Sequence, residues 1–447
     1  QQVFDMLPIR NVVSWTSLVG GYVEYGQGLK ALLCYEEMQI EGVFPTPLSL
    51  VCCLRACCSE GDLKKGREIH AKIEKWGIFE DDPFISSMLV NMYAKCSTLP
   101  EARQIFNKMK SRNQVSWNVL LAGYAEHFHT EGTLECFRQM QLEGVAPNDI
   151  TYITMLKACR SIGMPHIGQQ IHDDIERCGL ERDLAIGSTL VSMYAECGML
   201  VKAEQALDKL PLRNAASWNP LIMGYAEHGS GEEALKCVER MRVEGVSQDG
   251  VTCIGSFTAC GNMGSANKGR EIHAEAERKG FLESETSVGN ALIHMYGKSH
   301  SQDKAQKVFD KLQNRNIVSW TTLMAGYVQV GESESVFCIF DRMISECIQP
   351  DPITFVVILN ACTRIGFLNK SETYFEAMQE KYCITPTIEH ETCMIDLLGR
   401  IGELQKAAAL INEKPFTSNI VVWQSLLGAC RNWGNVMLGE HIFEHII

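Results

Sequence analysis

Apolar residues recur along this chain with the spacing of two amphipathic helices joined by a glycine. Trp218, Leu221 and Tyr225 lie three or four residues apart, which places them on one face of a helix. Gly229 follows, and a second apolar run leads on to Met241. Because glycine reaches the left-handed conformation at a helix end at little cost, the pattern predicts a helix, a tight turn and a second helix.

The same pattern occurs thirteen times. Tryptophans from Trp15 to Trp423 recur every 101 to 103 residues, and each step contains three related units of 31 to 36 residues. The fifteenth position is glycine in ten of the thirteen units. The units begin at Val12, Pro47, Pro83, Gln114, Asp149, Leu184, Ala215, Gly250, Thr286, Ile317, Pro352, Ile388 and Ile420.

Tandem hairpins of this kind predict an all-α fold. A single hairpin cannot bury its apolar face alone, whereas stacked neighbours can, and the stack forms an α-solenoid, a superhelix with a concave inner face. No alternation typical of a strand stands out. We expect Pro220 in the first turn of its helix, where the missing N–H has no intrahelical partner.

Composition narrows the class of protein. The chain has 447 residues, of which 46% are hydrophobic and 21% charged, and it lacks an apolar run long enough to span a membrane. A net charge of −13 argues against a generic nucleic-acid binder, which is usually basic. The nineteen cysteines contain no C-x-x-C spacing, and many recur at one unit position, as Cys57 and Cys159 do. We interpret them as buried apolar residues in a reducing compartment.

Catalytic motifs are not evident. The H-x-E of a zinc deaminase occurs at His273 and Glu275, but the C-x-x-C that completes such a zinc site is absent from the sequence. The same histidine recurs as His70 and His172 with Lys72 and Asp174 two residues later, so we interpret it as a packing position of the second helix. We expect no cofactor, no bound metal and no enzymatic activity in this segment.

The units resemble pentatricopeptide repeats. "VVSWTSLVGGY", from Val12, opens like such a repeat, and "EEMQIEGVFPT", from Glu36, ends like one. Three variants recur in fixed order, which is similar to the P, L and S repeats of the plant organellar PLS subclass. "VVWQSLLGACRNWGNVMLGE", from Val421, resembles the first half of the E motif that follows such an array.

The resemblance implies a domain organisation. Residues 1–11 would end a partial repeat, 12–387 would form the PLS-type array, 388–419 the terminal S-type repeat and 420–447 a partial E motif. It also implies a right-handed superhelix of tandem helix-turn-helix repeats. A cytidine deaminase domain would follow the E motif or be supplied by another protein. Because the chain begins inside a repeat, its first residues do not reveal a targeting signal.

The resemblance further implies that the fifth and the last residue of each repeat face one base of single-stranded RNA. A last-position Asp accepts from the imino N–H of guanine or uracil, whereas Asn donates to the bare ring nitrogen of adenine or cytosine. Fifth-position Ser or Thr favours purines and Asn favours pyrimidines. The predicted RNA-binding residues are Thr16, Thr46, Ser87, Asn113, Asn118, Asn148, Ser188, Asn214, Asn219, Asp249, Asn290, Asn316, Thr321, Asp351, Thr392 and Asn419.

Taken unit by unit, these pairs predict the target 5′-R-N-A-C-N-A-U-N-C-G-N-A-3′, with R a purine and N unassigned. The fourth position, read by Asn118 and Asn148, allows U as well as C. The unassigned positions belong to L-type units, whose fifth residues cannot hydrogen-bond through their side chains. The resemblance also implies that apolar second residues would sandwich the base faces. The L-type fifth residues are Val51, Ile153, Ile254 and Val356, and the second residues are Val13, Val115, Val251 and Val318.

Three functions follow from these patterns. The first is the recognition arm of a C-to-U RNA editing factor in mitochondria or chloroplasts, a monomer that binds single-stranded RNA and an editing partner but no membrane. The second is an organellar RNA processing, stability or splicing factor. The third is a protein-interaction scaffold of the tetratricopeptide kind, which suits the acidic charge. For any single Asn, Asp, Ser or Thr at these positions, helix capping is the alternative role.

Overall fold

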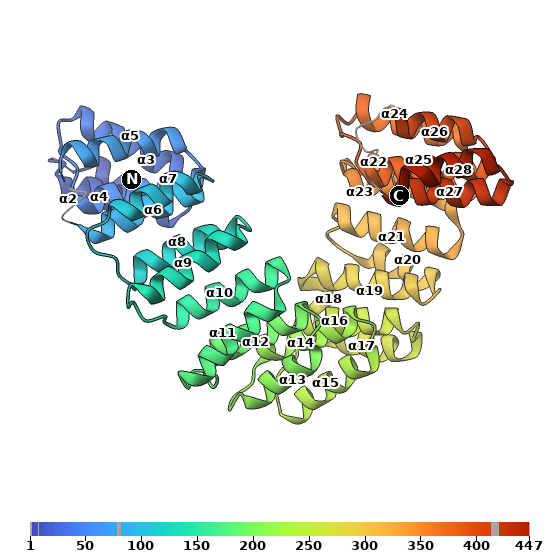
Figure 1. The fold of residues 1–447 in the computed structure, drawn as a ribbon, viewed down its shortest axis with the longest axis horizontal. Helices are drawn as coiled ribbons and strands as arrows, with labels where there is room; N and C mark the ends of the chain where they lie inside the picture. Colours follow the sequence, from blue (N-terminus) through green and yellow to red (C-terminus); the bar gives the residue numbers. More distant parts are fainter. Residues whose placement is uncertain (1, 8, 78–81, 413–419, 447) are drawn as a thin grey trace. The chain divides into compact units, whose positions relative to one another are not determined.

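The computed structural model describes residues 2–7, 9–77, 82–412 and 420–446. These residues form α-helices without a strand among them, so the predicted all-α fold is confirmed. Figure 1 shows the helices following one another along the chain as packed pairs. The chain divides into two compact units, residues 1–213 and residues 214–447.

The first compact unit contains six complete helical hairpins after a short leading helix. Its helices are α1 (Gln2–Asp5), α2 (Val12–Glu24), α3 (Gly28–Ile40), α4 (Pro47–Glu60), α5 (Leu63–Lys75), α6 (Pro83–Lys95), α7 (Leu99–Lys108), α8 (Gln114–Glu126), α9 (Thr130–Leu142), α10 (Asp149–Ile162), α11 (Pro165–Arg177), α12 (Leu184–Glu196) and α13 (Leu200–Lys209).

The second compact unit continues the same pattern, with one short extra helix, α18. Its helices are α14 (Ala215–Glu227), α15 (Gly231–Val243), α16 (Gly250–Asn262), α17 (Ala266–Arg278), α18 (Phe281–Ser284), α19 (Thr286–Lys298), α20 (Gln302–Lys311), α21 (Ile317–Val330), α22 (Ser333–Ser345), α23 (Pro352–Ile365), α24 (Leu368–Glu380), α25 (Ile388–Ile401), α26 (Leu404–Asn412), α27 (Ile420–Trp433) and α28 (Val436–Ile446).

The first helix of every unit begins at the residue predicted from the sequence, from Val12 to Ile420. The ten fifteenth-position glycines all have a positive φ, as the turn between the two helices requires. The prediction of thirteen helical hairpins is therefore confirmed. These glycines are Gly26, Gly61, Gly163, Gly198, Gly229, Gly264, Gly331, Gly366, Gly402 and Gly434.

Three units keep the left-handed turn without a glycine. Ser97, Phe128 and His300 occupy the fifteenth position with φ values of 61°, 55° and 51°. A residue with a Cβ pays roughly 1–2 kcal/mol to adopt this conformation. The stacked helices therefore impose the turn even where the local sequence disfavours it.

Replacing Phe128 by Gly is expected to stabilise the chain. Its side chain is 67% exposed and buries little, so the change mainly removes backbone strain. After the extra chain entropy of glycine is subtracted, the free energy of unfolding should rise by about 0.5–1 kcal/mol in urea titrations. Gly163→Ala is the matched control, because an added Cβ there would contact nothing within 4 Å. It should lower stability by about 1 kcal/mol, and a gain in both variants would contradict the explanation.

The recurring tryptophans form the core between consecutive units. Trp117 in α8 packs edge-on against Phe106 in α7, with ring centroids 4.5 Å apart. Trp320 in α21 packs in the same way against Phe309 in α20, at 4.6 Å. All four rings are fully buried, and such edge-to-face pairs add to the free energy of burial. Trp117 and Trp320 thus anchor the packing of their units against the unit before each of them.

The recurring glycine of the "GREIHA" phrase makes room for a methionine of the next unit. A Cβ built on Gly168 in α11 would lie 2.5 Å from Sδ of Met193 in α12, which is fully buried. The same interlock occurs between Gly66 and Met92, at 2.5 Å, and between Gly269 and Met295, at 2.6 Å. The "GREIHA" phrase, from Gly66, and the phrase "LVNMYAKC", from Leu89, recur together along the chain. They do so because the methionine of the second phrase fills the space that the glycine of the first leaves open.

The histidine of the same phrase binds a tyrosine of the next unit. Nδ1 of His172 lies 2.9 Å from the Tyr194 hydroxyl, and the equivalent distances are 2.8 Å for His70 and Tyr93 and 3.0 Å for His273. The histidine of the H-x-E sequence is therefore a packing residue, as we predicted. Nowhere in the described ranges do His, Cys, Asp and Glu form a cluster that could hold a metal ion.

These histidines are expected to make the fold sensitive to mild acid. The pKa of His172 is lowered, mainly because the imidazole is buried. Glu176 raises this pKa, and Lys209 lowers it. A histidine with a lowered pKa binds fewer protons in the folded chain than in the unfolded chain, so stability falls as the pH drops below about 6.5. The loss continues until the pH reaches the lowered folded pKa.

We expect a lower urea midpoint at pH 5.5 than at pH 7.5 in the intact protein. In a His70, His172 and His273 triple Gln variant, the difference between the two midpoints should shrink. Glutamine keeps a polar group near the tyrosine but does not titrate. An unchanged difference would show that other groups carry the acid sensitivity.

One expectation about local structure is wrong. Pro220 does not lie in the first turn, because Asn214 caps α14 and makes Pro220 its sixth residue. Pro220 therefore lacks the N–H that would bond the Ala216 carbonyl one turn earlier. The helix continues because fully buried residues on both sides, such as Trp218 and Ile222, hold it in the core.

The cysteines at the recurring position are buried as predicted, whereas Cys178, Cys338, Cys347 and Cys383 are exposed. All nineteen are free thiols, and the recurring Cys57, Cys159, Cys260 and Cys362 are buried in first helices. Burial raises the pKa of the Cys159 thiol to about 12 and that of Cys362 to about 11, so both stay protonated and unreactive at neutral pH. A search of the described residues finds no helix with the length and apolar character needed to cross a membrane.

Candidate functional site

The last residue of most units caps the first helix of the unit that follows. Oδ1 of Asn113 accepts from the Ser116 N–H at 3.0 Å, and Oδ1 of Asp351 accepts from the Thr354 N–H at 2.7 Å. Such caps satisfy donors that the helix leaves free. The capping role is therefore confirmed at these positions. The others that cap in this way are Asn11, Thr46, Asp82, Asn148, Asp183, Asn214, Asp249 and Asn316.

Capping occupies only one end of each of these side chains. With Oδ1 turned to the helix, the Nδ2 groups of Asn113 and Asn316 have no protein partner in the part of the chain that the structure describes, and both residues are exposed. The same holds for Oδ2 of Asp351, which is half-buried. The cap thus orients the side chain. It leaves a donor outward on Asn and an acceptor outward on Asp.

The fifth residues with hydroxyl groups are held by their own helices. Thr16 donates to the Val12 carbonyl at 2.7 Å, and Thr321 donates to the Ile317 carbonyl at 3.0 Å. Each hydroxyl oxygen can then only accept a further bond. The other residues that follow this pattern are Ser87, Ser188 and Thr392.

The fifth residues with amide groups instead reach across to the last residue of the same unit. Nδ2 of Asn118 donates to Oδ1 of Asn148 at 3.0 Å, and Nδ2 of Asn219 donates to both oxygens of Asp249 at 3.0 and 3.1 Å. A longer bond of 3.4 Å joins Asn290 to Asn316. The structure therefore brings the predicted fifth and last residues together in these three units.

Most predicted fifth residues are nearly buried, and Ser188 and Thr392 are half-buried. Thr16, Ser87, Asn118 and Asn290 have relative exposures of 9%, 4%, 8% and 9%. The last residues are half-buried or exposed. A ligand would therefore meet the last residue first, with the tip of the fifth residue beside it.

Asp249 remains an anion across the physiological range. Burial raises the pKa of its carboxyl, but hydrogen bonds from the Thr252 backbone and from the side chains of Asn219 and Thr252 outweigh burial and lower it. The carboxylate can then act only as an acceptor. The carboxylate can therefore accept a hydrogen bond from a base that has an imino N–H. It would repel a base that has a bare ring nitrogen at the same place.

A groove of about 610 Å³ surrounds the first predicted base-facing pair. Thr16 and Thr46 line it together with the exposed apolar side chains of Val13 and Leu48 and with Arg55. This combination offers hydroxyl groups, apolar faces and a cation within one concave space. It could hold a flat ring between apolar residues and a negatively charged group near the arginine.

The apolar second residues project into solvent as expected. Val13, Val115, Val251 and Val318 are 67%, 57%, 47% and 50% exposed. Other units also have an exposed apolar second residue, which the sequence analysis did not include. The same position within the repeat would have identified them. These further exposed apolar residues are Leu48, Phe84, Ile150 and Ile353, at 60%, 57%, 55% and 64%.

An arginine that sequence reasoning also passed over holds the last residue in place. Arg315 donates to the carbonyls of Phe309 and Asp310 at 3.0 and 2.8 Å and lies 5.0 Å above the Phe309 ring. Its Nη1 is 3.6 Å from Glu346 in the next unit. The segment before Asn316 is thereby fixed. The signal was the repeated Arg-Asn dipeptide, at residues 10–11, 112–113, 213–214 and 315–316.

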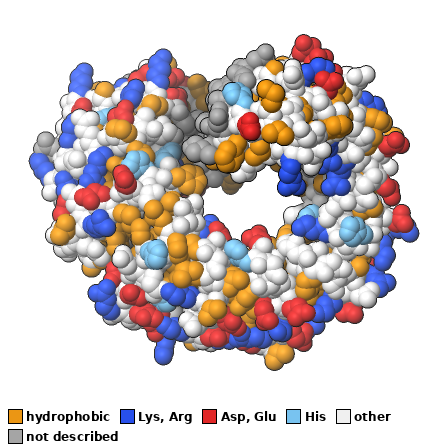
Figure 2. All heavy atoms as spheres, turned by 45° about the vertical axis from the view of Figure 1, so that its right-hand side comes forward, with side chains coloured by type: hydrophobic (Ala, Val, Ile, Leu, Met, Phe, Trp, Pro, Cys, Tyr) orange, Lys and Arg blue, Asp and Glu red, His pale blue; other side chains and the backbone are white. Residues whose placement is uncertain are grey.

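Much of the positive charge is paired. Lys311 lies 3.3 Å from Glu277, Arg112 lies 2.5 Å from Glu143, and Figure 2 shows basic and acidic side chains interspersed over the face in view. Partly exposed pairs of this kind contribute roughly 0–1 kcal/mol each and are screened by salt. Together with the net charge of −13, this pairing favours recognition through local polar groups over bulk attraction.

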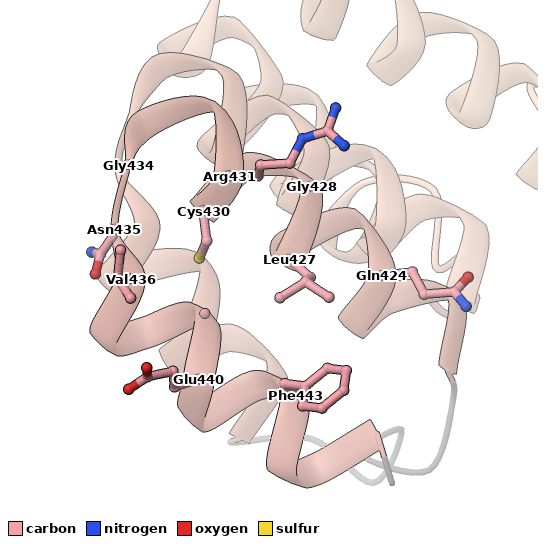
Figure 3. Close-up of a pocket in the computed structure, with 11 residues that line it drawn as sticks. Gln424, Leu427, Gly428, Cys430, Arg431, Gly434, Asn435, Val436, Glu440 and Phe443 are labelled. Carbon is pink, nitrogen blue, oxygen red and sulfur yellow. The ribbon is translucent and has the colours of Figure 1, made fainter.

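A second groove lies away from the predicted pairs. It has a volume of about 690 Å³ between α27 and α28, where Leu427 and Phe443 point toward each other and Arg431 points away (Figure 3). Its lining is mostly apolar and contains none of the predicted base-facing residues.

Two predicted pairs cannot be assessed as pairs. Ser188 belongs to the first compact unit and Asn214 to the second, so each is described only within its own unit. Asn419, the predicted partner of Thr392, lies outside the described residues.

The tandem helical hairpins define an α-solenoid repeat protein. Within that class, the chain belongs to the pentatricopeptide repeat family. The model of the PPR repeat family matches residues 10–59, 112–161 and 315–364, and the PPR repeat model matches residues 49–78, 84–114, 216–246 and 353–383.

Relatives and a solved structure agree with this membership. A putative pentatricopeptide repeat-containing protein of Arabidopsis thaliana is 34% identical over 99% of this chain and 64% of its own length. Two others from that plant, one named chloroplastic and one mitochondrial, are each 31% identical over 98% and 99% of this chain and 52% and 58% of their own lengths. The chain thus spans roughly half to two thirds of these relatives.

Among solved structures, the pentatricopeptide repeat protein PPR10 in complex with an 18-nucleotide psaJ RNA element has a similar fold. It aligns with a TM-score of 0.64 over 98% of this chain and 79% of that chain, at 15% identity. The predicted α-solenoid is confirmed by this likeness.

Proposed function

We propose that this chain binds single-stranded RNA with sequence specificity, one nucleotide per repeat, as the recognition arm of an organellar C-to-U RNA editing factor. One observation carries the proposal. Asn113 and Asn316 cap a helix and keep Nδ2 turned outward as a donor, and Asp351 caps a helix and keeps Oδ2 outward as an acceptor, the two kinds of group that base readout requires.

Bases in single strands offer the matching edges. Adenine and cytosine present a bare ring nitrogen that accepts from an Asn Nδ2, whereas uracil and guanine present an imino N–H that donates to an Asp oxygen. The exposed second-position side chains supply apolar surfaces for base faces. The predicted target is 5′-R-N-A-C-N-A-U-N-C-G-N-A-3′.

The comparisons support this proposal at two points. The solved PPR10 structure of similar fold is a complex with RNA. Relatives of this chain carry chloroplastic or mitochondrial names, which supports an organellar location. The order of P, L and S variants and the E-like end at residues 420–447 favour an editing factor of the PLS subclass, acting with a deaminase that is C-terminal or supplied in trans.

Binding is tested by fluorescence anisotropy with a labelled RNA of the predicted sequence and a scrambled RNA of equal composition. Each correct hydrogen-bonded choice is worth roughly 1–3 kcal/mol by analogy with duplex readout, so the predicted RNA should bind far more tightly. The preference should persist at raised salt, because it does not rest on bulk charge. Equal, negligible binding of both RNAs would reject RNA recognition and support a protein-interaction scaffold.

The editing role is tested separately by sequencing organellar transcripts with and without the gene. A cytidine behind a matching site should lose editing when the gene is absent. Under this proposal, that cytidine lies four nucleotides beyond the base assigned to Thr392 and Asn419. Unchanged editing with altered transcript ends would reject the editing role and support a processing or stability factor.

A further inference from the structure

The three units with a fifth-position Asn differ in how its amide is held. An amide can face either way, with its oxygen or its nitrogen toward the last residue, and neighbouring groups decide which orientation is stable. The third residue of the following helix is the neighbour that differs. It is Thr151 after Asn118, Thr252 after Asn219, and Ser319 after Asn290.

At Asn118 both ends of the amide are fixed. The Thr151 N–H donates to Oδ1 of Asn148 at 3.0 Å, which turns that oxygen inward and leaves it only able to accept. Asn118 must therefore offer its Nδ2, at 3.0 Å. The Thr151 hydroxyl completes the arrangement by donating to Oδ1 of Asn118 at 2.6 Å.

Asn219 repeats this arrangement with a charged partner. The carboxylate of Asp249 can only accept, so Nδ2 of Asn219 faces it. The Thr252 hydroxyl lies 2.7 Å from Oδ1 of Asn219. Both ends of this amide are again fixed.

At Asn290 the second bond is missing. The Ser319 hydroxyl lies 3.0 Å from Oδ1 of Asn316 and does not reach Asn290. Within the described ranges Oδ1 of Asn290 has no hydrogen-bond partner although it is buried, and the bond from Nδ2 to Asn316 is long, at 3.4 Å. A buried acceptor without a donor destabilises this orientation of the amide.

We propose that the third residue of the following helix is a specificity-determining positioning residue. Thr151 and Thr252 hold both ends of the amide of the preceding unit before RNA binds, whereas the amide of Asn290 is held only by its long bond to the capped Oδ1 of Asn316 and turns more easily. The inference rests on the proposed RNA recognition and adds a residue to each reading unit. A locked amide presents its donor only, while a turning amide presents donor or acceptor and accepts either pyrimidine.

The chain supplies its own control. Two units carry the same pair of residues. Asn118 and Asn148 would face the fourth nucleotide of the predicted target, and Asn290 and Asn316 would face the ninth. We expect the ratio of affinities for C over U to be higher at the fourth nucleotide than at the ninth, by about two- to tenfold, the effect of one hydrogen bond. This order is the reverse of the sequence-based prediction, in which the fourth nucleotide was the one that also allowed U. Anisotropy with four RNAs that differ only at these two nucleotides measures both ratios.

Variants test the cause. Ser319→Thr should raise the C-over-U ratio at the ninth nucleotide by about two- to tenfold and leave the fourth unchanged. Thr151→Val removes the hydroxyl without changing the shape, and it should lower the ratio at the fourth nucleotide only. Ser116→Thr is the matched control, because the preceding unit carries Ser87, which has no amide to lock.

The outcomes are distinguishable. If the wild-type chain shows no preference between the predicted and scrambled RNAs, the proposed function fails. If it shows that preference but the ratios at the two nucleotides are equal and Ser319→Thr changes neither, the positioning role fails alone. A change in all ratios together would show a structural effect and would also reject it. Should Thr151→Val fail to fold, Ser319→Thr still decides, because it keeps the hydroxyl and adds only a methyl group.

Discussion

Asn316→Asp is expected to change the preferred ninth nucleotide from C toward U. The substitution replaces the outward Nδ2 donor by a carboxylate oxygen, which accepts from the uracil imino N–H and repels the bare nitrogen of cytosine. The chain already contains the resulting pair, because Asn219 donates to both oxygens of Asp249. Asp caps a helix as well as Asn does, so α21 should be unaffected.

The size of this change follows from one base-specific contact. At roughly 1–3 kcal/mol, the C-over-U ratio should fall by about 5- to 150-fold in anisotropy titrations with RNAs that differ only at the ninth nucleotide. The reverse variant, Asp249→Asn, should move the seventh nucleotide from U toward C. If both variants melt like the wild type and keep the original preferences, these last residues do not read bases.

The helical units were predictable because their signals are local. A helix start needs a capping residue and an apolar face, and its end needs a residue that reaches the left-handed conformation. Asn113 and Gly163 carry these signals in the sequence itself, and the structure confirms both. Ser97 and Phe128 show the limit, since only the stacked neighbours force their turns.

The chemistry of the candidate site was predictable only in part. The family resemblance implied the fifth and last residues, and the structure joins them in three units. The sequence did not reveal that Asn118 and Asn290, identical in type and position, have different surroundings. That difference depends on how closely the next helix approaches and on whether it carries Thr151 or Ser319. The predictions for Ser188 with Asn214, and for Asn419, stay predictions.

Capping and base reading are compatible roles, although they began as alternatives. In an isolated helix, an Asn such as Asn113 turns its oxygen to the backbone and its nitrogen to water. In a row of stacked helices, that nitrogen instead faces the side where a ligand would lie. The same bond therefore stabilises the helix and fixes which group a base would meet.

Gly168→Leu is expected to destabilise the first compact unit strongly. The new side chain would occupy the space of the fully buried Met193, whose Sδ is 2.5 Å from the position of a Cβ at residue 168. Overpacking of this kind costs typically about 1–3 kcal/mol, and a leucine exceeds the space by several carbons. The urea midpoint should fall, and hydrogen exchange should increase most in α11 and α12.

A second substitution separates overpacking from a general intolerance of glycine replacement. Met193→Ala alone should also lower stability, by about 2–5 kcal/mol, because it leaves a cavity beside Gly168. Combined in one chain, the two changes should destabilise by less than their sum, because the leucine fills the space that the methionine vacates. Additive losses would show that the interlock of Gly168 with Met193 does not hold the two helices together. In that event the joint recurrence of the two phrases would need a different physical cause.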